Sequence, residues 1–233
     1  MRATVAIALF SLVVGSAQAD ELTPFEASYA WMWHGMTVAV STLKLEHQGG
    51  DIWVYSSKSS PRGIGKVYSQ RPVQKSVMRV TDAGVQPLSY DADDGTSSTK
   101  KDAHVKFDWE HGRASGVYEN NKVDEPLHPG IQDDASVQVA LMVELLAGRE
   151  PQKFQMQYDN TVREGVYHRE REESIDTPLG KVDTIVYAAQ KIGSPRVTRF
   201  WCAPAYGFIP MRVEQSKDDD VQWTMQLKSF KRE

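Results

Sequence analysis

Apolar and polar residues alternate with a period of two along most of the chain from about Phe25 onward. The alternation is strictest in residues 105–110, where Val105, Phe107 and Trp109 are each followed by a charged residue, and in residues 221–228. Because successive side chains of a β-strand point to opposite faces, this pattern predicts strands with one face in the core and the other in water. About ten or eleven strands are expected, at residues 37–47, 52–57, 73–80, 105–111, 114–118, 153–158, 165–172, 182–189, 196–202, 211–215 and 221–228.

Short connections with residues that tolerate tight turns separate these runs, at residues 48–51, 111–113, 120–121 and 178–180. Short links join antiparallel neighbours, so the sheet is expected to be mainly antiparallel. The polar segment 91–101 is expected to be a longer surface connection between two hairpin partners. Residues 20–233 contain no repeat and no long Pro- or Ser-rich linker, and they are expected to form a single β-rich domain.

One segment breaks the alternation and predicts a helix over residues 135–147. Asp133 and Asp134 precede it as candidate N-terminal caps, and Gly148 follows it as a stop signal. The segment is apolar on nearly every face, which is typical of a helix enclosed by protein. Together, the strands and this helix predict an all-β fold in which a strongly curved sheet or half-open β-barrel wraps around one apolar α-helix.

The first 19 residues have the pattern of a cleaved signal peptide. Arg2 precedes an apolar run at residues 4–14, and Ala17-Gln18-Ala19 matches the recognition pattern of a signal peptidase, so the mature chain is expected to begin at Asp20. The apolar run is too short to span a bilayer, and Cys202 is the single cysteine, so neither a membrane span nor a lipid anchor is expected. These features predict a periplasmic protein without an intrachain disulfide.

No motif in the sequence predicts catalysis, a cofactor or a metal ion. The glycine-rich motifs of hydrolases, dinucleotide-binding proteins and phosphate loops are absent, and the six histidines match no common zinc spacing. His128, Asp133 and Ser136 could nominally form a triad, but a structural role at the start of the helix explains the last two better. Cys202 is expected to be a buried, inert thiol. With 27 basic against 31 acidic residues, nucleic acid is not an expected partner.

Two other clusters have both a structural and a functional interpretation. Trp31, Trp33 and Met36 predict either core packing or the apolar mouth of a ligand site, and further candidate lining residues are Leu141, Met142 and Leu145 on the helix. The charged run at residues 169–173 is interpreted as a strand edge whose charges oppose aggregation.

Three stretches together resemble an exported bacterial family known as domain of unknown function 3108. They are residues 130–136, which lead into the apolar helix, residues 177–181, and residues 199–203 together with 208–213. The residues that carry the resemblance, all expected to be structural, are Gln132, Asp133, Ser136, Gly180, Trp201 and Pro210. The resemblance implies an envelope protein with a bent antiparallel sheet around a helix, similar to lipoprotein-carrier folds, and it implies no catalytic residue.

The sequence therefore favours an exported envelope protein without catalytic activity that acts through contacts with another envelope protein. The alternative is a carrier or sensor of a hydrophobic ligand in the concave sheet, whether a lipid, an acyl chain or a lipoprotein. A hydrolase is a lesser alternative. What discriminates the first two is whether the helix fills the concavity of the sheet or leaves a gap lined by apolar side chains.

Overall fold

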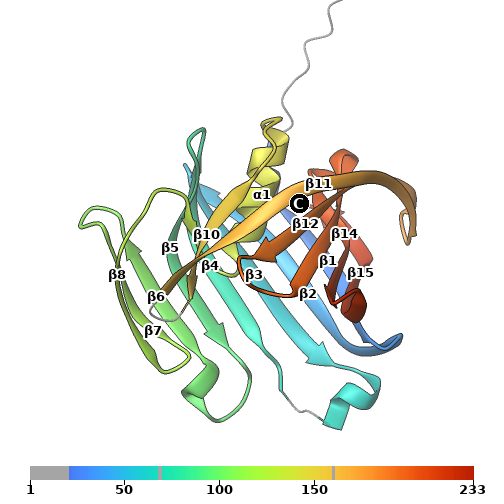
Figure 1. Ribbon diagram of the computed structural model, residues 1–233, viewed down its shortest axis with the longest axis horizontal. Coiled ribbons are helices and arrows are strands. Elements are labelled where there is room, and N and C mark those ends of the chain that lie inside the picture. Colours follow the sequence, from blue (N-terminus) through green and yellow to red (C-terminus); the bar gives the residue numbers. More distant parts are fainter. Residues whose placement is uncertain (1–20, 68–69, 159–160) are drawn as a thin grey trace, which may run out of the picture.

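The computed structural model describes residues 21–67, 70–158 and 161–233, and the predicted signal peptide lies outside them (Figure 1). The strands are β1 (Phe25–Trp33), β2 (Met36–Gly49), β3 (Ile52–Pro61), β4 (Val73–Thr81), β5 (Gly84–Asp93), β6 (Ala103–Asp108), β7 (Arg113–Tyr118), β8 (Asn121–Pro126), β9 (Ile131–Gln132), β10 (Lys153–Tyr158), β11 (Thr161–Thr177), β12 (Gly180–Lys191), β13 (Arg196–Ala203), β14 (Ile209–Lys217) and β15 (Asp220–Arg232). The α-helix is α1 (Ser136–Leu146), and short 3-10 helices occur at η1 (Gly63–Val67), η2 (Thr99–Lys101) and η3 (Pro204–Tyr206).

All fifteen strands belong to one curved sheet in the order β8-β7-β6-β5-β4-β3-β2-β1-β15-β14-β13-β12-β11-β10-β9. Among the described residues, neighbouring strands pair antiparallel except β9 and β10, which are parallel. The sheet curls until its edge strand β9 contacts β5, yet no backbone ladder joins this pair (Figure 1). Instead, the side-chain amide of Gln132 donates to the carbonyl of Val85 at 2.9 Å.

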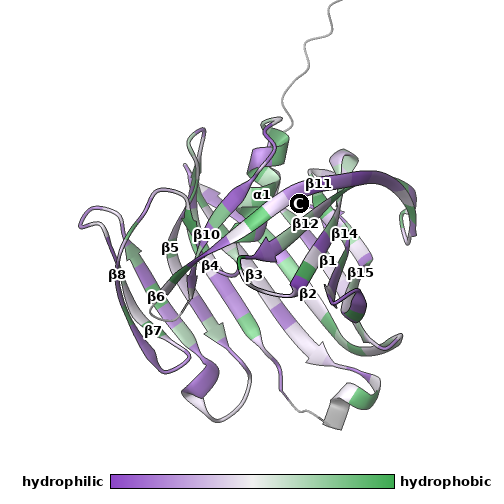
Figure 2. Cartoon of the chain, in the orientation of Figure 1, coloured by the Kyte–Doolittle hydropathy of each residue, from purple (hydrophilic) through white to green (hydrophobic). Residues whose placement is uncertain are grey.

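Helix α1 lies on the concave face of the sheet and packs against β4, β5 and β9. It agrees with the predicted helix to within one residue at each end. Its apolar residues are visible as green turns in Figure 2, and Val139, Leu141 and Met142 are buried. The strands follow the predicted alternation. In β1, for example, Phe25, Ala27 and Tyr29 are buried while Glu26 is exposed.

The predicted number of strands was too low, because four strands were missed. They are β1, β5, β8 and β9. In β1 Ala30, Trp31 and Met32 are buried or half-buried on both faces, so this part of the strand does not alternate. Strand β5 contains Pro87 and has an irregular register at Leu88, β8 is rich in charged residues, and β9 has only two residues. Tertiary pairing, not local pattern, defines these strands.

The two ends of the curved sheet differ. The register places the β1–β2, β12–β13 and β14–β15 turns at one end of the sheet, which we call the lower end. The last turn of α1 lies at the opposite, upper end, where Val143 and Leu146 line a hollow together with Gly50 and Asp82. The first turn of the helix therefore faces into the interior, and the helix occupies the upper part of the concavity.

The charged run of β11 lies where that strand lacks a second neighbour. Residues 161–166 pair with β10, whereas residues 169–177 pair with β12 alone among the described strands. Arg171 and Glu170 form an ion pair at 2.9 Å in this segment, beside a bulge in the register. This placement agrees with the interpretation of the run as a charged edge.

Candidate functional site

A buried polar cluster holds the start of α1 against the sheet. Gln132, Asp133 and Ser136, together with Ser76 of β4, are each at most 2% exposed. The Ser76 hydroxyl donates to Oδ2 of Asp133 at 2.7 Å, and Gln132 reaches β5 through the carbonyl of Val85. The cluster therefore connects the helix to two strands that are distant from it in the sequence, and it spans the point where β9 approaches β5.

The spacing of Asp133 and Ser136 explains the local structure. Oδ1 of Asp133 accepts hydrogen bonds from the backbone N–H groups of Ala135 and Ser136, at 2.8 and 2.7 Å. In return, the Ser136 hydroxyl oxygen accepts from the backbone N–H of Asp133 at 2.9 Å. This reciprocal arrangement is a capping box, which satisfies N–H groups that a helix leaves unpaired at its first turn. Asp134, the other candidate cap, accepts a hydrogen bond from the Tyr118 hydroxyl instead.

Burial is the largest influence on the pKa of Asp133. Loss of solvation raises the pKa of its carboxyl group to about 6, although hydrogen bonds from Ser136, Ser76 and Ala135 favour the charged form and oppose the shift. The folded protein therefore holds the Asp133 proton across a pH interval in which the unfolded chain has already released it. This cluster thus makes folding stability depend on pH.

We expect Asp133→Asn to remove a pH-dependent loss of stability. As pH rises from about 4 to about 7, the wild-type carboxyl group loses a proton that folding favours, so the free energy of unfolding of the wild type should fall by roughly 2 kcal/mol relative to the variant. Asparagine keeps an acceptor for the backbone N–H groups and an amide that can donate to Ser76. Urea denaturation of both proteins at pH 4 and pH 7 measures the difference and cancels the contribution of all other carboxylates. Parallel pH profiles would contradict the assignment.

The nominal triad is not assembled. Ser136 is fully buried and engaged with Asp133, whereas His128 is exposed on the connection between β8 and β9. Within the described residues, no hydrogen bond joins the His128 ring to Asp133 or Ser136. Cys202 is also fully buried, and burial raises the pKa of its thiol, so the protonated and poorly nucleophilic form is favoured.

An interior cavity of about 610 Å³ lies between the start of α1 and strands β10 to β15. Tyr167 of β11 and Phe200 of β13 are stacked with ring centroids 6.5 Å apart, and Trp223 of β15 adds a third aromatic side chain. Val137 is the residue that the helix itself contributes. The lining consists of Asp134, Val137, Met156, Gly165, Tyr167, Ala189, Gln190, Lys191, Ser194, Arg196, Thr198, Phe200, Gln215 and Trp223. The helix thus leaves part of the concavity unfilled.

The two basic residues of the cavity lining lie at its lower end. Lys191, Ser194 and Arg196 come from the end of β12, the β12–β13 turn and the start of β13. Loss of solvation lowers the pKa of Lys191, whereas the charge of Asp134 opposes the shift. The cavity therefore has an aromatic wall and a cationic mouth, an arrangement that suits a molecule with an apolar chain and a polar or anionic head.

The predicted lining residues lie in three different places. Trp31 packs against Trp223, with ring centroids 4.9 Å apart, and thus stands behind the cavity wall. Trp33 and Met36 flank the β1–β2 turn, about half exposed, and do not line the cavity. Leu141, Met142 and Leu145 are buried in the core and also lie outside the lining, which the helix reaches through Val137.

Sequence reasoning missed Tyr167, Phe200 and Trp223, the aromatic residues of the cavity. Each lies in an alternating strand, so its side of the strand could have been read from the pattern. The pattern could not show that these three residues line one cavity. Strands β11, β13 and β15 come together around the start of α1 only in the folded sheet.

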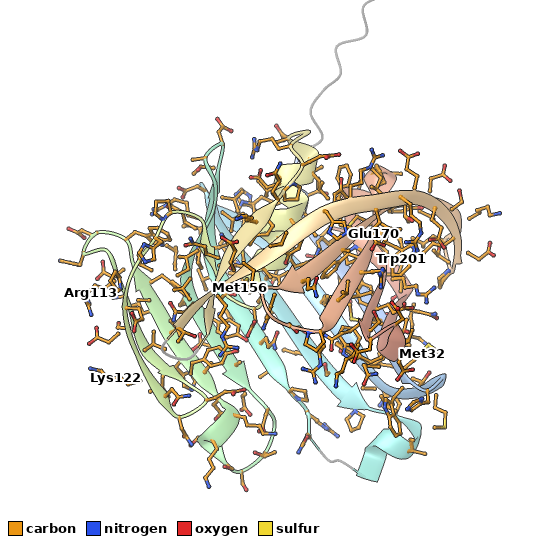
Figure 3. All side chains as sticks on the ribbon, in the orientation of Figure 1. Met32, Arg113, Lys122, Met156, Glu170 and Trp201 are labelled. Atoms are coloured by element: carbon orange, nitrogen blue, oxygen red, sulfur yellow. The ribbon has the colours of Figure 1, made fainter. Side chains whose placement is uncertain are left out.

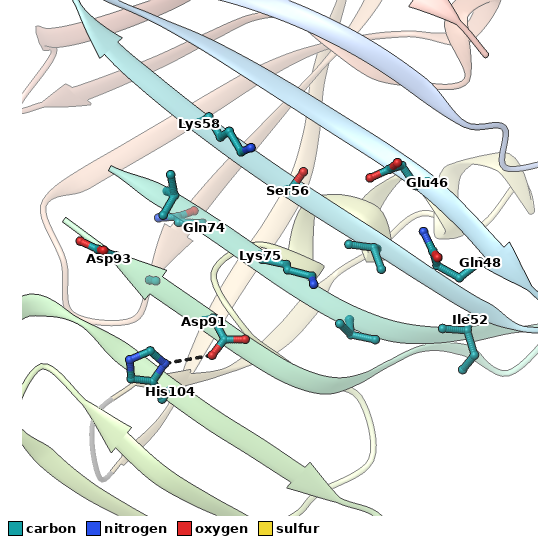
Figure 4. A pocket seen from close by; sticks show the side chains of 14 residues that line it. Glu46, Gln48, Ile52, Ser56, Lys58, Gln74, Lys75, Asp91, Asp93 and His104 are labelled. Atoms are coloured by element: carbon teal, nitrogen blue, oxygen red, sulfur yellow. Dashed lines mark hydrogen bonds and ion pairs between the residues drawn. The ribbon is translucent and has the colours of Figure 1, made fainter. Parts of the chain in front are cut away.

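A second hollow of about 570 Å³ lies on the outer face of the sheet, across β2 to β6 (Figure 4). Its floor includes Ile52, Val54 and Val77, and charged side chains surround it. His104 and Asp91 form a hydrogen bond of 2.9 Å at one side (Figure 4). We call this hollow the outer groove.

The remaining family-motif residues have structural surroundings. Gly180 has φ +96° at the β11–β12 turn, a conformation that favours glycine. The carbonyl of Pro210 accepts a hydrogen bond from the buried Tyr29 hydroxyl at 3.0 Å. Trp201 points to the outer face of β13, and its indole N–H donates to Glu173 at 3.1 Å (Figure 3).

One acidic group in the described part of the chain has a geometry that a cation could use. Carboxylate oxygens of Asp93, Asp94 and Asp102 lie within 4.8 Å of one another near the β5–β6 connection. Asp93 and Asp94 already accept hydrogen bonds from the backbone N–H groups of Gly95 and Thr96. These bonds explain the conformation of the loop without a metal ion.

Comparison with solved structures supports the fold. A β-barrel-like protein of the domain of unknown function DUF1849 from Brucella abortus is 10% identical, with a TM-score of 0.59 over 92% of this chain and 99% of the other. A protein from Bacteroides fragilis, described as a candidate exported protein with a YmcC-like fold, is also 10% identical, with a TM-score of 0.41 over 90% of this chain and 96% of the other. The first likeness shows a β-barrel-like fold and nothing of function.

Curated proteins offer no significant sequence match. Within residues 21–67, 70–158 and 161–233, no helix combines the length and the hydropathy needed to cross a bilayer. The family model of DUF3108, a protein of unknown function, matches residues 25–227, a span that includes the motifs at the start of α1 and around Trp201. The chain therefore belongs to the DUF3108 family, as those motifs predict.

Proposed function

We propose that the protein is exported to the periplasm and binds a hydrophobic ligand, a lipid or an acyl chain, in the interior cavity without catalysing a reaction. The observation that supports this most directly is the cavity of about 610 Å³ beside α1. This volume lies within the range of roughly 300–1,000 Å³ that is typical of small-molecule sites. In this proposal α1 closes the upper part of the curved sheet and its first turn forms the floor of the site.

The distribution of side chains suggests how such a ligand lies. Tyr167, Phe200 and Trp223 offer apolar contact surface inside the cavity, and burial of a chain against them is favourable in proportion to the apolar area removed from water. Lys191 and Arg196 stand at the mouth, where they can meet a carboxylate or phosphate. A single-chain amphiphile with its head at the β12–β13 turn satisfies both features.

The lack of catalysis is part of the same proposal. It is supported by the burial of Ser136 and Cys202, the two candidate nucleophiles considered in the sequence analysis. Both lie where a substrate could reach them only after the core opened. Within the described residues, no hydrogen bond joins His128 to Asp133 or Ser136, so the triad considered for the lesser alternative of a hydrolase has no support.

Protein contacts at the outer groove are the second candidate function. This groove has an apolar floor of Ile52, Val54 and Val77, and charged side chains surround the floor. It is wide open to solvent and therefore suits a protein segment better than a small molecule. The two functions use different faces of the sheet and can be tested separately.

We expect Ala189→Trp to weaken ligand binding by at least about tenfold, because the indole would occupy space in the cavity where Ala189 lies half-buried. The measurement is titration of the purified, processed protein with cis-parinaric acid, a fluorescent fatty acid. Ala189→Ser is the matched control, since it alters the same position without added bulk and should bind as the wild type does. Equal affinity in the wild type and the folded Trp variant would contradict the site.

A further inference from the structure

Five large apolar side chains are exposed at the lower end of the sheet. Trp33 and Met36 flank the β1–β2 turn, Ile64 lies in η1, Ile192 in the β12–β13 turn, and Val221 next to the β14–β15 turn. They are between 40 and 70% exposed. We call these five residues the rim. Loop tips are normally polar, and single exposed apolar residues need no explanation. Five such residues on four connections at one end of a sheet do need one.

The rim residues follow one another along the end of the sheet at which the mouth of the interior cavity lies. Trp223 lines both that cavity and a smaller hollow of about 280 Å³, which also involves Val221, His34 and Gly35. The rim therefore continues from the β12–β13 turn to the β1–β2 turn. On the far side of β2, the backbone N–H of Arg62 donates to the carbonyl of Val38 at 2.8 Å, which holds η1 and Ile64 beside that hairpin.

Charged residues accompany the apolar ones on the same turns. Arg62 precedes η1, and Lys191 and Arg196 flank the β12–β13 turn, all three exposed. Within the described residues, neither Arg62 nor Arg196 has a carboxylate partner in an ion pair. Asp218, Asp219 and Asp220 precede Val221 and give that turn a negative charge. Cations next to apolar tips match the phosphates and acyl chains of a lipid surface.

We propose that the rim docks on the surface of a phospholipid bilayer and brings the mouth of the interior cavity to the membrane. Separate apolar tips suit a bilayer, which accepts side chains wherever they enter, whereas a protein partner would need a matching pocket for each of them. The exposed indole of Trp33 suits the interface between head groups and acyl chains. In this proposal the bilayer is the source of the hydrophobic ligand. Docking itself does not depend on ligand binding, but its role in supplying the ligand rests on the proposed function.

Flotation with vesicles tests the rim directly. The processed protein is mixed with vesicles of equimolar phosphatidylethanolamine and phosphatidylglycerol, and the fraction that floats is measured over a range of lipid concentrations. The double variant Trp33→Ser, Met36→Ser should lower the partition coefficient by at least about tenfold, since it removes two large side chains from the contact. Ile192→Ser should lower it by a smaller factor. All positions are exposed, so melting temperatures should stay close to that of the wild type.

The matched control is Leu179→Ser, which removes an exposed apolar side chain from the β11–β12 turn at the opposite end of β12. It should float as the wild type does. Failure of the wild-type protein to float, or equal flotation of the rim variants, would overturn the proposal. Titration with cis-parinaric acid in the absence of vesicles separates membrane docking from ligand binding. The rim variants should still bind cis-parinaric acid. Ala189→Trp should lose this binding but still float with vesicles.

Discussion

Leu141→Asp is expected to unfold the protein. Leu141 is 1% exposed in the middle of α1 and belongs to the hydrophobic core. A carboxylate at this position must either stay charged without a partner or take up a proton at a cost in free energy. The destabilisation should reach several kcal/mol, comparable to the whole net stability of about 5–15 kcal/mol that is typical of a domain. Circular dichroism and urea denaturation measure the outcome.

Leu141→Met is the control for this experiment. It conserves volume and apolar character, so it should cost less than about 1.5 kcal/mol and leave the fold intact. A soluble Leu141→Asp variant with native circular dichroism and an unchanged denaturation midpoint would refute the burial of α1. A variant that folds but no longer binds cis-parinaric acid would instead indicate that this face of the helix borders the ligand.

The parts of the fold that could be predicted are those that depend on local pattern. The helix was predictable because residues 135–147 lack alternation and are bounded by Asp133 and Gly148, all of which are local signals. Strands such as β6 and β15 were predictable for the same reason. Strand β8 was not, because half of its residues are charged and most are exposed, and it forms only through its pairing with β7. Its strand character arises from hydrogen bonds to a neighbour rather than from its own composition.

The candidate site was predictable only in part, for a related reason. Gln132, Asp133 and Ser136 were recognised as one motif because they are adjacent in the sequence. Ser76, which completes the buried cluster, lies 57 residues from Asp133 and has no sequence signal that links the two. The cavity wall likewise combines side chains from β11, β13 and β15, so its existence depends on how the sheet curves around α1. Residue spacing cannot report that curvature.

Trp201→Ala is expected to lower the free energy of unfolding by about 3 kcal/mol, a value typical of a buried aromatic side chain. Trp201 is 2% exposed although it points away from α1, because charged side chains cover it on the outer face. The guanidinium carbon of Arg212 lies 4.6 Å from the centre of its ring, and that of Arg171 lies 5.7 Å away. Cation–π contact and the apolar stems of these arginines therefore bury the indole. Urea denaturation measures the loss.

Trp201→Phe separates the apolar contact from the polar one. Phenylalanine keeps a ring beneath Arg212 but lacks the indole N–H that donates to Glu173, so the cost in stability should fall to about 1 kcal/mol. The hydrogen bond from Trp201 is the main reason that the pKa of Glu173 is lowered, with Arg171 contributing as well. In the Phe variant, NMR titration should therefore show the Glu173 pKa moving up toward its ordinary value. If that pKa stays unchanged while Trp201→Ala is still strongly destabilising, the indole stabilises the sheet by burial alone, and its bond to Glu173 has no measurable part in holding β11 against β13.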